Sequence, residues 1–232
     1  MNVQEATTRR LPDLKERHLP ENCRETINTI LKETYEQFRN LEIYDDLSKG
    51  KEKLCISQGQ LIENVILEAE KAWKSETQVD NILLTAPTGS GKSLLFQLPA
   101  IYLGKGYNLL TIVVSPLKAL IVDQVESLQE LGYTRVAYAS SDLSPEQKME
   151  VYRQVREGEI DLFYLSPELL LSYDIKHFVG ERRIGLVVVD EAHTVTTWGK
   201  EFRVDYWFLG RYLNTLKQTL GYNFPLFALT AT

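Results

Sequence analysis

Residues 86–93 constrain the fold more than any other segment, because they set two glycines and a lysine between two different apolar patterns. The residues just before them, 82–85, form an apolar run typical of a buried strand. The residues after them have the spacing of an amphipathic helix, carried by Leu94, Leu95, Gln97, Leu98 and Ile101. The sequence therefore predicts a strand, a tight loop and a helix in direct succession.

Residues 86–93 read Ala-Pro-Thr-Gly-Ser-Gly-Lys-Ser, which matches the phosphate-binding loop except at the first position, where Ala86 replaces the usual glycine. Glycines let successive backbone N–H groups converge on phosphate oxygens without a side chain in the way. The positive end of the next helix faces the same oxygens. We expect Lys92 to contact the β- and γ-phosphates and Ser93 to hold Mg²⁺. The backbone expected to cradle the phosphates comprises Thr88, Gly89, Ser90 and Gly91.

Further apolar runs alternate with helical patterns along the rest of the chain. The strand candidates are residues 109–115, 136–139, 162–166, 186–190 and 227–230. A helix at residues 59–73 is expected before the first strand. Strands that alternate with helices form a parallel sheet through right-handed crossovers. We therefore expect an α/β fold in which helices cover both faces of a parallel sheet.

An acidic pair follows one of these strand candidates directly. Residues 187–189 are consecutive valines, and Asp190 and Glu191 come next. In a parallel sheet ligands collect at the carboxyl ends of the strands, so this pair and the phosphate-binding loop are expected at the same edge. We expect Asp190 to hold Mg²⁺ and Glu191 to orient and deprotonate the attacking water. The predicted catalytic residues are therefore Glu191, Asp190 and Lys92, and the predicted metal ligands are Ser93 and Asp190.

The composition excludes several classes of protein. Of the 232 residues 44% are apolar and 25% are charged, as in ordinary globular proteins, and the net charge is −6. No apolar run approaches the roughly 18 residues of a membrane span, and residues 1–10 lack the apolar segment of a signal peptide. We expect a cytoplasmic location and no membrane partner. Neither half of the chain is net basic, so contacts to nucleic acid must come from local loops or from other parts of the protein.

Residues 1–54 match no functional pattern and are interpreted as an N-terminal arm and helix. Apolar residues recur at helical spacing over 27–38, which predicts a helix packed on the core domain, with a partner-binding helix as the alternative. Residues 45–53 are expected to form a charged loop. Cys23 and Cys55 have no cysteine or histidine at ligand spacing, so we expect unpaired thiols rather than a disulfide or a zinc site.

The nucleotide motifs resemble those of a known family. Asp190-Glu191-Ala192-His193, with the upstream Gly-Ser-Gly-Lys-Ser, is similar to the first motor domain of superfamily-2 helicases. Three further segments narrow the resemblance to RecQ-type helicases. They are residues 115–120, 162–168 and 229–232.

Each segment implies a role through that resemblance. The first two are similar to family segments that face the nucleic-acid backbone. The implied contacts are Ser115, Pro116, Lys118 and Ser166. The third is similar to the Thr-Ala-Thr motif, which links nucleotide state to a second motor domain. The residues implied in this coupling are His193, Thr230 and Thr232.

Residues 197–203 resemble the aromatic-rich loop of RecQ-type helicases, which couples binding of single-stranded DNA to ATP hydrolysis. Trp198 and Phe202 can stack on bases, each worth roughly 1–3 kcal/mol, and Arg203 can contact phosphates. The chain departs from the family pattern at Lys200-Glu201 and at Val204.

The glutamine that recognises adenine in this family follows a Phe-Arg pair, which this chain lacks. We assign that role to Gln60, with Gln58 as the alternative.

The resemblance covers about residues 55–232 and implies a RecA-like P-loop NTPase domain that uses ATP and Mg²⁺. It implies the N-terminal ATP-binding domain of an ATP-dependent DNA helicase, acting on single-stranded or partly duplex DNA. A second RecA-like domain, absent from these residues, would supply an arginine finger, so we expect little ATP hydrolysis by this chain alone. An RNA helicase is one alternative reading. A non-unwinding ATP-driven switch in a repair or defence complex is another.

Overall fold

A parallel sheet forms the centre of the molecule in the computed structural model, which describes residues 38–44, 53–192 and 204–230. Its strands run in the order β3-β8-β7-β4-β6-β5, and all neighbours are parallel. Their bounds are β3 Ile82–Thr85, β4 Leu110–Val114, β5 Val136–Ala139, β6 Leu162–Leu165, β7 Ile184–Val189 and β8 Leu226–Thr230. Every residue of β4, β6 and β7 is buried, which explains why these strands are almost entirely apolar in sequence.

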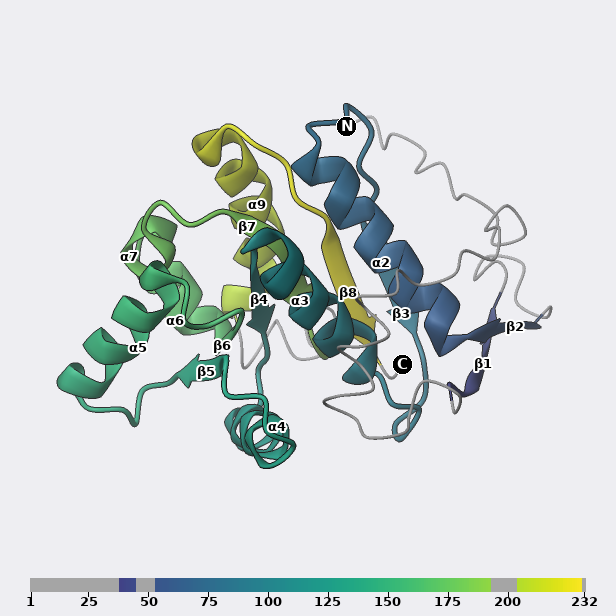
Figure 1. Cartoon of the computed structure of the whole chain (residues 1–232), viewed down its shortest axis with the longest axis horizontal. Coiled ribbons are helices and arrows are strands. Elements are labelled where there is room, and N and C mark those ends of the chain that lie inside the picture. The colour runs from purple at the N-terminus through teal and green to yellow at the C-terminus, as the bar shows by residue number, and fades with distance from the viewer. Residues whose placement is uncertain (1–37, 45–52, 193–203, 231–232) are drawn as a thin grey trace.

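Helices cover both faces of this sheet (Figure 1). One face packs against α2 Gln58–Trp73, α3 Leu94–Tyr107 and α4 Lys118–Glu130. The other packs against α5 Pro145–Glu157, α6 Pro167–Ser172, α7 Ile175–Val179 and α9 Val204–Leu220. The predicted α/β fold with helices on both faces is therefore confirmed. Within the described residues, no helix combines the length and apolar character that a membrane span requires.

The predicted elements agree with the structure to within two residues at most ends. The strand from Ile82 to Thr85 and the helix ending at Trp73 are both present. The prediction of an amphipathic α3 was wrong, because this helix is buried on nearly all sides from Leu95 to Gly104. It packs against β4, β6 and β7 of the sheet and against α2, which contributes to the same apolar core.

A β-hairpin precedes α2 and was not predicted. Its strands, β1 Asn40–Tyr44 and β2 Lys53–Ser57, pair antiparallel, with Leu41 opposite Ile56. Both of these side chains are buried in the core shared with α2 and the sheet. The predicted domain boundary between residues 54 and 55 falls inside β2, and the predicted charged loop ends one residue into that strand. Of the helix predicted at 27–38, only Phe38 lies among the described residues.

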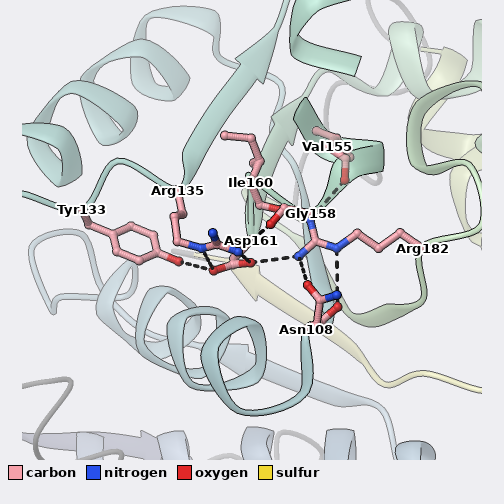
Figure 2. Close-up of polar contacts among 8 residues, drawn as sticks. All are labelled: Asn108, Tyr133, Arg135, Val155, Gly158, Ile160, Asp161 and Arg182. Carbon is pink, nitrogen blue, oxygen red and sulfur yellow. Dashed lines mark hydrogen bonds and ion pairs between the residues drawn. The ribbon is translucent and has the colours of Figure 1, made fainter. Parts of the chain in front are cut away.

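A buried charge network joins residues that lie just before β4, β5, β6 and β7 (Figure 2). Because these strands run parallel to β3, this is the edge of the sheet opposite the phosphate-binding loop. Asp161, which is fully buried, lies just before β6. Its carboxylate accepts hydrogen bonds from Arg135 Nε at 2.6 Å, Arg182 Nη2 at 2.8 Å and the Tyr133 hydroxyl at 3.1 Å. Burial raises the pKa of the Tyr133 hydroxyl, and the Asp161 charge raises it further. The two arginines also donate to backbone carbonyls, including those of Gly158, Val155 and Asn108.

Candidate nucleotide-binding site

The phosphate-binding loop forms a tight turn between β3 and α3. Gly89 and Gly91 have φ angles of +79° and +76°, which side chains other than glycine's rarely adopt. The Ser90 N–H donates to Pro87 O at 3.3 Å, and the Leu94 N–H donates to Gly91 O at 3.2 Å, where α3 begins. The two glycines therefore reverse the chain and lead it into the helix.

Three consecutive backbone N–H groups lie where this loop leads into α3. In the part of the chain that the structure describes, the backbone N–H groups of Gly91, Lys92 and Ser93 donate to no protein acceptor. They lie at the start of α3, where unpaired donors and the helix dipole favour an anion. This row of donors is suited to phosphate oxygens.

The side chains of Lys92 and Ser93 are placed differently. Lys92 Nζ folds over the loop and donates to Ala86 O at 2.9 Å and to Pro87 O at 3.4 Å. Ser93 is the N-cap residue of α3, but its side chain makes no capping hydrogen bond, because its backbone is already helical. The Ser93 hydroxyl is therefore not needed to start the helix and can serve a metal ion.

Asp190 and Glu191 leave β7 at the same edge of the sheet. Asp190 is buried, with 5% of its surface exposed. Its backbone N–H donates a hydrogen bond to Val114 O at 2.9 Å, and its side-chain Oδ1 accepts one from the Glu191 N–H at 3.0 Å. Glu191 has a φ of +52°, a left-handed conformation that strains a residue with a side chain. Burial, and after it the Asp190 charge, raises the pKa of the Tyr164 hydroxyl. The Asp190 backbone is thus held by a hydrogen bond to β4, and the Asp190 carboxylate lies near the uncharged Tyr164 hydroxyl.

The order of the strands brings the two motifs together. β8 lies between β3 and β7 (Figure 1), with Thr85 opposite Thr230. The Ala86 N–H donates to Thr230 O at 3.0 Å, and the Ala192 N–H donates to Leu229 O at 2.8 Å. Strands pair about 4.8 Å apart, so β3 and β7 lie roughly 10 Å from each other. A metal–triphosphate group can span that gap.

A family model described as DEAD/DEAH box helicase matches residues 67–232, which is most of the chain. The chain belongs to the DEAD/DEAH box helicase family. Among curated relatives of this helicase domain, the ATP-dependent DNA helicase RecQ of Synechocystis is 42% identical over 155 residues, covering 65% of this chain and 30% of the relative. The ATP-dependent helicase SGS1 of Saccharomyces cerevisiae is 35% identical over 167 residues, covering 70% of this chain and 11% of the relative. The resemblance to RecQ-type helicases is confirmed, although the chain spans less than a third of these relatives.

Solved helicase structures share the fold of this helicase domain. The DUF1998 helicase MrfA bound to DNA and AMPPNP has a TM-score of 0.60 at 20% identity, with 94% of this chain and 27% of that chain covered. A hypothetical ATP-dependent RNA helicase from Sulfolobus tokodaii has a TM-score of 0.56 at 18% identity, with 90% and 50% covered. At these identities the likeness concerns the fold alone.

The two candidate glutamines of the helicase domain have different contacts. Gln60 closes a capping box at the start of α2: its Oε1 accepts from the Ser57 N–H at 3.0 Å, and its own N–H donates to Ser57 Oγ at 3.1 Å. Gln58 is 3% exposed, and its Nε2 donates to Ser90 O at 2.9 Å. Only Gln58, the second choice from sequence, touches the phosphate-binding loop through a hydrogen bond in the described residues.

Four of the residues implied in nucleic-acid contact, Ser115, Pro116, Lys118 and Ser166, follow the carboxyl ends of β4 and β6, two neighbouring strands of the helicase domain. Ser115 and Pro116 are buried, and Ser115 Oγ has no hydrogen-bond partner among the described residues. Ser166 caps α6 by accepting from the Leu169 N–H at 3.3 Å. Lys118 Nζ forms an ion pair with Asp142. Ser166 and Lys118 therefore have structural partners that account for them without nucleic acid.

Five residues implied by the resemblance lie outside the described residues. They are His193, Trp198, Phe202, Arg203 and Thr232. The coupling and aromatic-loop roles assigned to them stay predictions.

Proposed function

We propose that this chain is the N-terminal ATP-binding motor domain of a RecQ-like DNA helicase, which couples ATP hydrolysis to translocation on DNA and its unwinding. The observation that carries the proposal is the arrangement across β8, which brings a row of unused N–H donors and an acidic pair to one edge of the sheet. Phosphoryl transfer needs both parts, because charge must be neutralised at the phosphates while a water molecule is activated.

Each residue of the site has a distinct role in this proposal. The Gly91, Lys92 and Ser93 N–H groups bind phosphate oxygens, and Lys92 Nζ exchanges its two loop carbonyls for the β- and γ-phosphates. Ser93 and Asp190 are the ligands assigned to Mg²⁺, which neutralises phosphate charge when bound.

Glu191 is assigned to the attacking water, because it directly follows the proposed metal ligand and its left-handed backbone is a strained conformation of the kind that clusters at active sites. A general base contributes typically about 10²–10⁴-fold to a rate, provided it lies within hydrogen-bond reach of the water.

The partner proposed for the motor domain is single-stranded or partly duplex DNA. Ser115 and Ser166, at neighbouring strand ends, are assigned to its backbone, together with Pro116 and Lys118. Trp198, Phe202 and Arg203 are assigned to the same strand of DNA. His193, Thr230 and Thr232 are assigned to coupling with a second RecA-like domain.

The nucleotide half of the proposal is tested by calorimetric titration of the full 232-residue chain with ATP, with and without Mg²⁺. We expect Lys92→Ala to weaken ATP binding at least about tenfold, because it removes charge-assisted hydrogen bonds. We expect Asp190→Asn to abolish the gain in affinity that Mg²⁺ provides. Lys105→Ala, an exposed lysine in the last turn of α3, is the matched control and should bind as the unsubstituted chain does. Equal ATP affinity in all four proteins would overturn the proposal.

A further inference from the structure

Gln58 connects the phosphate-binding loop to the hairpin that precedes α2. It is the first residue of α2 and is 3% exposed. Its side-chain Oε1 accepts from the Arg39 N–H at 3.0 Å, and its backbone N–H donates to Arg39 O at 3.0 Å. Its side-chain Nε2 donates to Ser90 O at 2.9 Å. Both ends of the amide are therefore used by backbone groups from two different segments.

The bond to Ser90 O fixes the direction of the next N–H. In a trans peptide the C=O and N–H point to opposite sides, so a carbonyl held by Gln58 turns the Gly91 N–H away from Gln58. That N–H belongs to the row of unused donors in the loop. The contact is close, since a Cβ built on Gly91 would lie 2.6 Å from Gln58 Nε2.

The other end of Gln58 is anchored where the hairpin closes. Arg39 directly precedes β1, Gln58 directly follows β2, and Asn40 pairs with Ser57 between them. The hairpin is itself tied to the core through Leu41 and Ile56. Gln58 therefore connects the loop to an anchored support.

We propose that Gln58 is a positioning residue for phosphate binding: it holds the Ser90 carbonyl so that the Gly91 N–H points at the nucleotide's phosphates, and it does not read the base. This inference rests on the proposed function, since it concerns the same nucleotide site. It predicts that replacing Gln58 weakens the binding of every triphosphate by the same factor, whatever base the triphosphate carries.

The test compares Mg²⁺ complexes of ATP, GTP and inorganic tripolyphosphate, titrated calorimetrically into the full chain. Gln58→Glu keeps an acceptor for the Arg39 N–H but sets a carboxylate oxygen against Ser90 O. Gln58→Met is neutral and removes both side-chain hydrogen bonds, so it separates loss of the bond from added charge. Gln147→Glu, in the exposed capping box of α5, is the charge control. Thermal melting of each variant checks that it folds.

We expect Gln58→Met to weaken the binding of all three ligands by the same factor, about five- to tenfold, which corresponds to the loss of the hydrogen bond to Ser90 O. Gln58→Glu should weaken them at least as much, and Gln147→Glu should leave them unchanged. A loss confined to ATP would overturn the inference and assign Gln58 to adenine. Unchanged affinities in both Gln58 variants, with Lys92→Ala still impaired, would overturn it and leave the proposed function standing. An unsubstituted chain that binds none of the three would overturn both.

Discussion

Single residues in the phosphate-binding loop are constrained for two separate reasons, backbone conformation and space. Gly89 and Gly91 both have left-handed φ angles, but only at Gly91 would a Cβ meet a neighbour, the Gln58 side chain. A Cβ at Gly89 would meet no atom of the described residues within 4 Å, apart from Gly89's own chain neighbours. The two glycines therefore separate the cost of the conformation from the cost of displacing Gln58.

Gly91→Ala should weaken ATP binding about tenfold more than Gly89→Ala does. In both variants the left-handed backbone conformation of alanine costs about 1–2 kcal/mol of free energy. Gly91→Ala also displaces the Gln58 amide from its hydrogen bond to Ser90 O. Calorimetric titration with Mg²⁺ and ATP measures the difference, and thermal melting shows whether both variants fold. If the two variants had equal affinity, the Gln58 contact would not matter for phosphate binding.

Tyr212→Phe should raise the free energy of unfolding by about 1 kcal/mol at neutral pH, because the Tyr212 hydroxyl is buried and finds no hydrogen-bond partner among the described residues. Burial, and after it the Asp174 charge, raises the pKa of Tyr212 to about 12. The stability linked to this group is complete below the unfolded pKa, near 10, and falls as pH rises towards the folded pKa. Urea denaturation from pH 8 to 11 should therefore give a shallower decline for Tyr212→Phe than for the unsubstituted chain. A parallel decline would contradict the assignment.

Sequence patterns predicted the helices and strands whose positions are determined by local apolar runs. The run 187–189 and the phosphate-binding loop gave β7, β3 and the start of α3 closely. The hairpin was missed because β1 and β2 are five residues each and carry charged residues among their apolar ones. A motif position alone does not reveal that the Gln60 side chain caps its own helix, or that the Gln58 side chain contacts the phosphate-binding loop.

The Asp161 network was not predicted either, because its members come from separate strand ends. A weak signal existed: Arg135 and Asp161 each directly precede a fully apolar strand. A charged side chain that is buried at such a position needs a partner of opposite charge, because burying an unpaired charge costs much free energy. Which charges meet depends on the order of the strands, which local patterns do not contain.

Asp161→Asn should lower the free energy of unfolding by about 3–5 kcal/mol, because Arg182 would keep its charge in a buried site without the opposite charge. Glu150→Gln, which removes an exposed ion pair with Arg153 on α5, is the control and should have a far smaller effect. Urea denaturation followed by circular dichroism measures both. Equal effects would mean that the Asp161 network contributes no more than a surface pair.

The whole molecule explains why motifs about a hundred residues apart can form one site. β8, near the end of the chain, lies between β3 and β7 and carries Thr230 to the start of the phosphate-binding loop. The family motifs implied this proximity, but the sheet order provides its physical cause. The chain covers 30% of the Synechocystis RecQ and 11% of SGS1, so translocation and unwinding stay proposals.

The proposal that ATP hydrolysis by this helicase is coupled to DNA is tested most directly by steady-state ATP hydrolysis of the full-length protein. The assay is run with single-stranded DNA, with single-stranded RNA and without nucleic acid, using Lys92→Ala as the background. We expect DNA to stimulate hydrolysis strongly, RNA to stimulate it weakly or not at all, and Lys92→Ala to abolish the activity. Stimulation by RNA alone, or hydrolysis indifferent to nucleic acid, would contradict the claim.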